Sequence, residues 1–224
     1  MMRRLFPPLL ALLPALALLG GCMEIPQASK RQPIRQSTQS FTPRPEARQC
    51  LASLGATRAS FTPLPDQYFG AGCSTVNTVR LASLQGDHAA LALSNLGPVT
   101  CPLASTFAGW ARFGVDRAAR QVLGSGLLRI ETMGSYSCRN VAGSSRRSAH
   151  ATANAIDVAA FVLEDGRRIS VVGDWIGGSA AERQFLQLVH ASACKRFGTV
   201  LGPNYNAAHR DHLHVELSGS SFCR

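Results

Sequence analysis

The chain has 224 residues, 46% of them hydrophobic, and a formal net charge of +10. From Cys50 to Arg224 the composition is that of a globular protein, and this length suits one domain with a sizeable core rather than several domains. The excess of basic residues favours an anionic partner, although a generally basic proteome would give the same balance.

The N-terminal segment is typical of an export signal. Arg3 and Arg4 form a charged region, and the apolar run from Leu5 to Leu19 is too short for a comfortable membrane span. The run ends at Leu19-Gly-Gly-Cys22, which resembles the bacterial lipobox, whose cysteine is lipidated and becomes the first residue of the mature protein. We therefore expect residues 1–21 to be a lipoprotein signal peptide, with an ordinary secretory signal as the alternative.

The residues after the signal indicate where the domain works. Met23 is not the aspartate that resembles an inner-membrane retention signal, so we expect Cys22 to anchor a lipoprotein in the outer membrane, facing the periplasm. Nucleic acid is not normally available there, which leaves peptidoglycan carboxylates or lipid head groups as the anionic partner. Residues 22–49 are rich in Pro, Gln, Ser, Thr and Arg, and we expect them to form a flexible tether to a domain over residues 50–224.

Six cysteines remain once Cys22 is set aside. They are Cys50, Cys73, Cys101, Cys138, Cys194 and Cys223. An even number of cysteines in an exported protein argues for three disulfides rather than metal thiolates. Sequence alone does not choose among the possible pairings.

The middle of the domain predicts a helix, a strand and a long loop. Apolar residues recur at helical spacing over residues 101–123, with Pro102 suited to a first turn and Gly124 to a stop. Residues 127–133 form a predicted strand, and the Ser-, Arg- and Gly-rich residues 134–147 form a long loop. Long loops inside compact domains are often functional.

The C-terminal part predicts further strands and a capped helix. Residues 155–163 and 167–172 are apolar and β-branched, and the Asp-Gly pair between them favours a hairpin. Residues 179–196 have helical periodicity, with a Ser-x-x-Glu capping box at their start and His190 expected in the core. A final strand over 212–217 completes an α+β fold, a small antiparallel sheet with helices packed on one side and braced by disulfides.

The histidines are concentrated near the C-terminus, where His209, His212 and His214 fall within six positions, while His150 and Asp157 stand earlier in the chain. Imidazole and carboxylate are ligands that zinc takes, and a catalytic zinc site needs three protein ligands and an open position. On one helix, His150 and Asp157 would lie about 10.5 Å apart along the axis, so we expect the chain between them to loop back. The alternative is a solvent-exposed histidine cluster without metal.

The final strand would supply the remaining groups of this site. Side chains alternate along a strand, so His212 and His214 should project from the same face. We expect His214 to be the third ligand and His212 to exchange a proton with water at the metal, because the unperturbed pKa of histidine lies near neutrality. His209 and Asp211 are candidates for the same role or for orienting the ligands.

Four segments of the domain carry a family resemblance. They are Gly134-Ser-Tyr-Ser-Cys-Arg139, Ser148-Ala-His150 to Asp157, Leu201-Gly-Pro-Asn204 and His209 to Glu216. On these segments, most of residues 50–224 resembles the extensin-like C-terminal domain family of bacteria. That family is similar to the zinc D-alanyl-D-alanine peptidases and to the penicillin-insensitive murein endopeptidases. The resemblance implies an α+β fold of the zinc D-Ala-D-Ala peptidase and hedgehog type.

The resemblance also implies roles for individual residues. One Zn²⁺ per domain would be held by His150, Asp157 and His214. Ser148 corresponds to the serine that precedes the first ligand by two residues. Arg139 matches an arginine that helps to hold the oxyanion in the peptidases, where a fixed cation can lower the barrier by a few kcal/mol.

Two departures from the family patterns bear on the site. In the D-Ala-D-Ala enzymes a glutamate three residues before the last ligand is the general base, whereas this chain has the shorter Asp211 there. The endopeptidases have histidines spaced as in this chain, which favours His212 or His209 as the base instead. The common pattern also has a glycine where this chain has Ala153, and the added methyl requires a negative φ.

These patterns predict a zinc metallopeptidase that hydrolyses amide bonds in peptidoglycan stem peptides or cross-links, as a murein carboxypeptidase or endopeptidase of the cell envelope. The alternative is a non-enzymatic peptidoglycan-binding or structural lipoprotein that keeps the fold without turnover. Zinc storage or sensing is disfavoured because the ligand set has too little thiolate for buffering. We expect a monomer that contacts peptidoglycan and, through Cys22, a membrane, but no nucleic acid.

Overall fold

The computed structural model describes residues 44–224. The expected signal peptide, the lipidation site Cys22 and most of the expected tether lie outside the described residues. The first helix, α1 (Pro45–Ala56), begins before Cys50, so the folded domain starts within the end of the segment that we assigned to the tether. No helix in the described part is long and apolar enough to cross a membrane.

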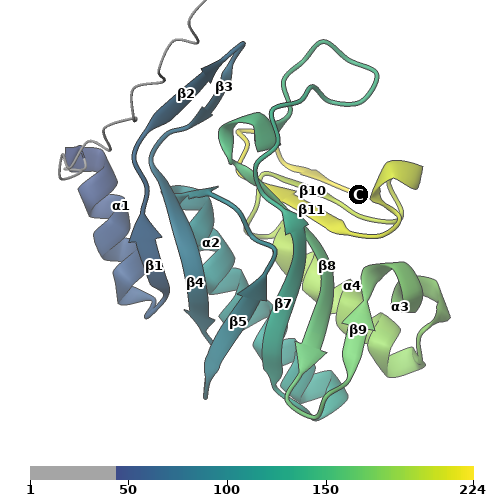
Figure 1. The fold of residues 1–224 in the computed structure, drawn as a ribbon. Helices are drawn as coiled ribbons and strands as arrows, with labels where there is room; N and C mark the ends of the chain where they lie inside the picture. The colour runs from purple at the N-terminus through teal and green to yellow at the C-terminus, as the bar shows by residue number, and fades with distance from the viewer. Residues whose placement is uncertain (1–43) are drawn as a thin grey trace, which may run out of the picture. The chain divides into compact units, whose positions relative to one another are not determined.

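A series of short strands follows α1. Their bounds are β1 (Ser60–Pro63), β2 (Gln67–Gly70), β3 (Cys73–Thr75), β4 (Thr78–Gln85), β5 (Ala90–Ser94) and β6 (Val99–Thr100). β2 and β3 form a separate two-stranded hairpin, while the other strands join the main sheet. The hairpin projects from one end of the domain (Figure 1).

The central helix confirms the prediction for residues 101–123. α2 (Cys101–Trp110) is followed by two π-helical segments, Ala111–Asp116 and Ala119–Leu123. Gly124 then has a φ of 69°, the left-handed conformation that commonly ends a helix.

The strands and the loop that follow also match the prediction. β7 (Leu127–Gly134) and β8 (Ala155–Leu163) occupy the predicted positions. Between them, a long loop over residues 135–148 leads into the 3-10 helix η3 (Ala149–Thr152). The loop therefore connects one central strand to the first of the expected metal ligands.

The C-terminal part alternates strands and helices. The elements are β9 (Arg168–Ser170), α3 (Val171–Gly177), α4 (Ala180–Cys194), β10 (Thr199–Leu201), the 3-10 helix η4 (Ala207–His209), β11 (Leu213–Glu216) and β12 (Phe222–Cys223). The predicted capping box of α4 is present. The predicted strand over 167–172 is wrong at its end, because the Ser170 hydroxyl accepts a hydrogen bond from the Gly173 N–H and caps α3.

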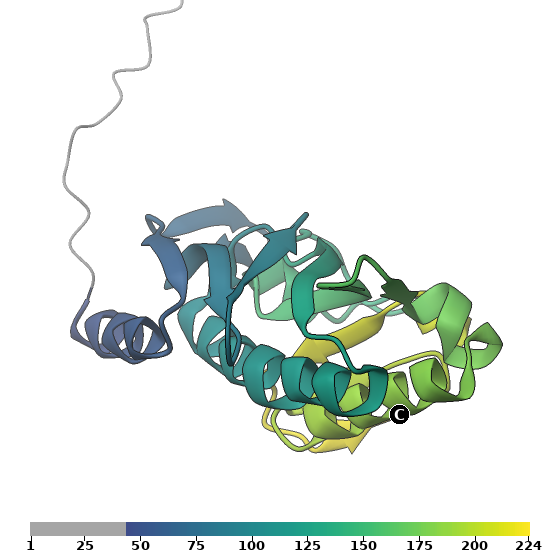
Figure 2. The same ribbon diagram turned by 90° about the horizontal axis from the view of Figure 1, so that it is seen from below.

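Within residues 44–224, the main sheet has ten strands, in the order β1-β4-β5-β7-β8-β11-β10-β12, with β6 beside β4 and β9 beside β8. Two pairs, β5 with β7 and β10 with β12, are parallel. The α+β class is therefore confirmed, but the sheet is larger than we expected and is not purely antiparallel. Figure 2 shows α1, α2 and α4 along one face of the sheet, as predicted.

The core lies between this sheet face and the helices. Trp110 is fully buried, and its ring centroid lies 5.4 Å from that of Phe107 and 6.2 Å from that of Phe161. Its indole N–H donates to the carbonyl oxygen of Val189 on α4, at 3.2 Å. This contact satisfies the one polar group of a large buried side chain.

All six cysteines of the described domain form disulfides, as predicted. Cys50 pairs with Cys101, Cys73 with Cys138, and Cys194 with Cys223. The first bond joins α1 to α2, the second joins the β2–β3 hairpin to the loop over residues 135–148, and the third joins α4 to β12. The second bond thus fixes the loop that leads into η3 and His150.

Candidate metal centre

Strands β8 and β11 bring the second and third expected ligands together. They pair antiparallel, and their register places His214 directly opposite Asp157. Directly opposed residues of paired strands have closely neighbouring side chains. His214 is 7% exposed and Asp157 is partly buried, so both side chains are largely withdrawn from water.

The first expected ligand comes from the 3-10 helix η3. Ser148 caps this helix, because its hydroxyl accepts a hydrogen bond from the N–H of His150. Ala153 then adopts a left-handed conformation, and its N–H donates to the carbonyl oxygen of His150 at 3.1 Å. The chain therefore loops back between His150 and Asp157, as their spacing requires, and the buried His150 side chain faces the other two.

The conformation of Ala153 contradicts our expectation of a negative φ. Its φ is 54° and its side chain is fully buried. A left-handed backbone costs a residue with a Cβ atom about 1 kcal/mol or more. The turn still holds His150 Nε2 3.2 Å from Asp157 Oδ2, so the cluster forms despite the left-handed alanine.

The nitrogen and oxygen atoms of the three side chains converge on one point. Nε2 of His150 lies 3.2 Å from Nδ1 of His214 and 3.2 Å from Oδ2 of Asp157. Nδ1 of His214 lies 2.9 Å from Oδ1 of Asp157. These three residues are one of two groups within the described domain whose ligand atoms lie close enough together to hold a metal ion.

Two outer contacts determine which nitrogen of each imidazole carries a proton. Nδ1 of His150 lies 3.1 Å from the carbonyl oxygen of Ser135, which can only accept, so in the neutral ring Nδ1 donates and Nε2 keeps a lone pair. Nε2 of His214 lies 3.1 Å from Oε2 of Glu216, so this nitrogen donates and Nδ1 keeps a lone pair. Two lone pairs and a carboxylate then face one another, an arrangement that is repulsive unless a proton or a cation lies among them.

The charges of this cluster shift its pKa values strongly. Burial alone would raise the pKa of Asp157, but its contacts with the imidazoles of His150 and His214 outweigh it and hold that pKa well below its usual range. Burial alone would lower the pKa of His214, but its contacts with Asp157 and Glu216 raise that pKa to about 9. When no cation lies among the three groups, a proton on His214 therefore does.

His212 lies beside the cluster, just before β11. Its Nδ1 is 2.8 Å from Oδ1 of Asp211, so the Nδ1–H donates to that carboxylate. Its Nε2 is 3.6 Å from Oδ1 of Asp157 and faces the cluster. His212 thus directs Nε2 towards the site while Asp211 orients its ring.

His209 is the outermost of the three C-terminal histidines. Its ring centroid is 5.1 Å from that of His212 and 5.9 Å from that of His214. Its Nδ1 lies 2.7 Å from Oδ1 of Asn206. Burial, followed by the charges of His212 and His214, lowers the pKa of His209 to about 4, so this imidazole is neutral near pH 7.

Residues 48–224 match the family model of the extensin-like protein C-terminus. The chain belongs to this family. No match was found among curated proteins, nor among solved structures. The extensin-like domain includes every residue of the cluster and almost the whole of the described structure.

The loop of the extensin-like domain over residues 135–148 carries Arg139, which we expected to stabilise an oxyanion. Its side chain is exposed. Its backbone carbonyl oxygen accepts a hydrogen bond from the N–H of Ser148, the residue that caps the helix of His150. The structure thus brings Arg139 near the cluster but not into contact with the three converging side chains.

Two hydrogen-bond acceptors that contact the cluster in the extensin-like domain were not predicted from the sequence. Glu216 and the carbonyl oxygen of Ser135 each fix one imidazole by accepting its N–H. Glu216 could have been found from strand alternation, since it follows His214 by two residues and therefore shares its face. The Ser135 carbonyl is a backbone atom, and no residue pattern identifies it.

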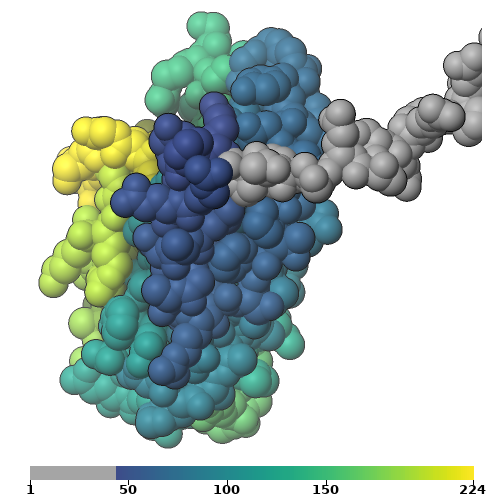
Figure 3. Space-filling view, turned by 90° about the vertical axis from the view of Figure 1, so that its left-hand side faces the viewer, coloured from purple at the N-terminus to yellow at the C-terminus, as the bar shows by residue number. Residues whose placement is uncertain are grey.

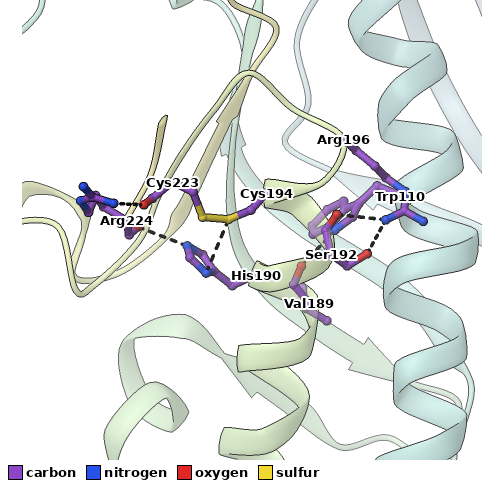
Figure 4. The surroundings of a disulfide bond; sticks show 8 residues. All are labelled: Trp110, Val189, His190, Ser192, Cys194, Arg196, Cys223 and Arg224. Atoms are coloured by element: carbon purple, nitrogen blue, oxygen red, sulfur yellow. Dashed lines mark hydrogen bonds between the residues drawn. A yellow bond between two sulfur atoms is a disulfide. The ribbon is translucent and has the colours of Figure 1, made fainter. Parts of the chain in front are cut away.

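The second group of ligand-type side chains in the extensin-like domain is His190, Cys194 and Cys223. Both sulfur atoms are used in the disulfide between α4 and β12 (Figure 4). His190 contacts this disulfide, with Nδ1 3.9 Å from Cys194 Sγ and Nε2 3.2 Å from the carbonyl oxygen of Arg224. His190 is only partly buried, so our prediction that it packs in the core is wrong, and it serves to join α4 to the C-terminal residues.

Proposed function

We propose that this protein is a zinc-dependent peptidase that hydrolyses peptide bonds in peptidoglycan stem peptides or cross-links. The observation that carries the proposal is the convergence of His150 Nε2, His214 Nδ1 and the Asp157 carboxylate, each with a lone pair directed at the others. Those lone pairs need a cation, and the donor set selects which one.

The donor set fits zinc. Tetrahedral zinc with ligand bonds of about 2.0 to 2.1 Å holds its donor atoms roughly 3.3 Å apart. The separations of 2.9 to 3.2 Å among the three side chains are close to that value. Two imidazoles disfavour calcium and magnesium, which take oxygen ligands. When bound, zinc would supply a Lewis acid for the scissile carbonyl and lower the pKa of a water molecule towards 7.

Outer contacts hold the ligands in place for this chemistry. Ser135 and Glu216 each accept the N–H of one ligand imidazole, which fixes the orientation of its ring. The negative charge of Glu216 also makes His214 a better electron donor. Ser148 contributes indirectly, because it caps the helix that carries His150.

His212 is the side chain best placed to accept a proton. Its Nε2 faces the cluster, and its Nδ1–H is held by Asp211. This arrangement is that of a general base oriented by a carboxylate. Asp211 is thereby assigned to orienting His212. His209 is a weaker base because its pKa is about 4.

Arg139 would stabilise negative charge on the substrate. It is exposed on the border of the site and can move towards a developing oxyanion. Three disulfides support action outside the cytoplasm, where such bonds persist. We place the protein in the cell envelope as a periplasm-facing monomer, anchored in the outer membrane through Cys22.

The test combines metal content with product analysis. The full chain, purified in detergent, is loaded with zinc, assayed by elemental analysis and incubated with purified sacculi. We expect one zinc per chain and new muropeptides by mass spectrometry. His214→Ala should remove both, whereas His88→Ala, which alters an exposed histidine outside the cluster, should change neither.

Each negative result has a defined meaning. Failure to hold stoichiometric zinc at neutral pH would sink the proposal. A fully zinc-loaded protein that binds sacculi but releases no muropeptides would instead support the non-enzymatic alternative.

A further inference from the structure

An aromatic pair lies beside the candidate metal centre. Phe69, on the hairpin strand β2, is 52% exposed, and its ring centroid lies 5.5 Å from that of Tyr136 on the loop over residues 135–148. A half-exposed phenylalanine on a short, fully exposed strand adds nothing to the core. Exposed apolar groups of this kind mark interaction surfaces.

Tyr136 is tied directly to the first expected metal ligand. The residue before it, Ser135, accepts the Nδ1–H of His150 through its carbonyl oxygen, at 3.1 Å. The residue after it, Ser137, donates its N–H to the carbonyl oxygen of His150, also at 3.1 Å. The aromatic pair is therefore continuous with the site.

The hairpin is fixed to this loop. Cys73 of β3 forms a disulfide with Cys138, and the Arg147 side chain donates to the carbonyl oxygen of Ala71 at the hairpin turn. Figure 3 shows the hairpin and the loop side by side at one end of the domain. Phe69 and Tyr136 are thus held as one rigid unit.

The same loop carries an excess of positive charge. Arg139, Arg146 and Arg147 are exposed, and residues 134–150 contain no acidic residue. No ion pair among the described residues involves any of these three arginines. Arg147 is already hydrogen-bonded to Ala71 and Asn140, whereas no hydrogen bond among the described residues involves the side chain of Arg139 or Arg146. The charges of Arg139 and Arg146 are therefore available to an anionic ligand.

Phe113 is also half exposed but lacks this combination of an exposed aromatic ring and unpaired arginines. Phe113 is 45% exposed on the helical face and also has two arginines over its ring, Arg112 and Arg117. Both guanidinium groups are paired with Asp87, however, at 2.7 Å each. The aromatic group at Phe113 therefore lacks the unpaired positive charge found beside Tyr136.

We propose that Phe69, Tyr136 and the loop arginines form a binding subsite for the peptidoglycan strand. A sugar ring would stack on the aromatic pair, because its axial C–H groups carry partial positive charge and the faces of aromatic rings are negative. Carboxylates of the stem peptide would bind Arg139 and Arg146. The choice of ligand rests on the proposed function, and the chemistry of the surface, aromatic and cationic, independently fits an acidic glycan.

The test measures binding without catalysis. The full chain in detergent is stripped of metal with a chelator and sedimented with purified sacculi at increasing protein concentration. We expect Phe69→Ala to weaken binding about fivefold to tenfold. The double variant with Arg139→Ala and Arg146→Ala should weaken binding more than Phe69→Ala does. Its binding should also depend less on salt concentration. Phe113→Ala is the matched control and should stay within about twofold of the parent.

A second ligand separates the two parts of the subsite. Oligomers of N-acetylglucosamine, which carry no carboxylate, should bind the parent and the double arginine variant equally, and Phe69→Ala more weakly. Phe69→Leu, checked by circular dichroism, guards against misfolding and should bind these sugars about as weakly as Phe69→Ala. Equal sacculus binding by Phe69→Ala and the parent would overturn the proposal, as would occupation of the hairpin by a second copy or by residues 1–43.

This experiment is independent of hydrolysis. Binding that depends on Phe69, in a protein that never releases muropeptides, would sustain the subsite and refute the peptidase. If Phe69→Ala changed neither muropeptide release nor binding, the result would support the peptidase and refute the subsite.

Discussion

The extensin-like domain contains two triads of ligand-type side chains, and they differ in what their atoms are free to do. His150, Asp157 and His214 direct three lone pairs at one point, whereas the sulfurs of Cys194 and Cys223 beside His190 are bonded to each other. Ligand residue types and proximity are shared, so neither identifies a metal site. What distinguishes the first triad is that outer hydrogen bonds fix its tautomers with the lone pairs facing inwards.

The sharpest test of this comparison removes one histidine from each triad. We expect His214→Ala to weaken zinc binding by about 1000-fold or more, since each ligand carries a large share of the binding free energy of a zinc site. His190→Ala should leave zinc affinity unchanged. Competition with a chromogenic chelator measures both variants, and equal losses would mean that the two triads are not distinct.

Loss of the disulfide in the second triad should lower stability without changing zinc binding. Replacing Cys194 and Cys223 by serine together should lower the free energy of unfolding by about 3 kcal/mol, because the bond closes a loop of moderate length. Zinc content should not change. Chemical denaturation and elemental analysis of the same preparation check this, and loss of zinc without loss of stability would contradict the assignment.

Glu216 tests whether the outer contacts matter as much as the ligands. Glu216→Gln keeps an acceptor for the Nε2–H of His214 but removes the charge, and we expect zinc affinity to fall about 10-fold, towards 100-fold for Glu216→Ala. Glu182→Gln changes a carboxylate in the capping box of α4 and is the matched control. An unchanged affinity in Glu216→Ala would show that packing alone orients His214.

The raised pKa of His214 predicts opposite pH dependences for metal binding and for the stability of the metal-free protein. Zinc must displace the proton, so its affinity should rise about tenfold per pH unit between pH 7 and about 9. In the metal-free protein, the same protonated histidine stabilises the fold fully below its unfolded pKa of about 6.5, and this stabilisation is lost as the pH rises through about 9.

Calorimetry in buffers of different ionisation enthalpy should detect about one proton released per zinc at pH 7. The His214→Ala variant is the control for the stability arm, because its metal-free form should lose the decline between pH 7 and 9. Zinc binding without proton release would mean that His214 carries no proton for zinc to displace in the metal-free protein.

Features that depend on neighbouring residues could be predicted from the sequence, whereas features that depend on contacts between distant segments could not. Local patterns placed β7, β8 and the capped helix α4, because alternation, helical periodicity and the capping box are set by neighbouring residues. They failed at Val171, where the Ser170 cap overrides a β-branched run, and they gave no prediction for the short strands between residues 60 and 100. Disulfide pairing and sheet size depend on contacts between distant segments, which no local pattern specifies.

The site follows the same division. The ligand candidates could be named because few residue types bind zinc and because strand alternation aligns His212 with His214. Their convergence with His150 depends on the register of β8 against β11 and on the turn at Ala153, both of which require the fold. Glu216 lay within reach of the alternation argument, whereas the Ser135 carbonyl did not.

The turn at Ala153 gives the smallest expected effect. Ala153→Gly relieves a left-handed conformation that costs about 1 kcal/mol, but it also removes a buried methyl worth about 0.8 kcal/mol and gives the unfolded chain more freedom. We expect the free energy of unfolding to change by less than about 1 kcal/mol and zinc affinity to stay the same.

Ala153→Val adds a β-branched side chain at the same left-handed position and should lower the free energy of unfolding by about 2 kcal/mol or more, with weaker zinc binding. Chemical denaturation and chelator competition measure both variants. If Ala153→Gly tightened zinc binding markedly, the alanine would be displacing His150 from its best position, and the turn would limit the metal centre rather than merely support it.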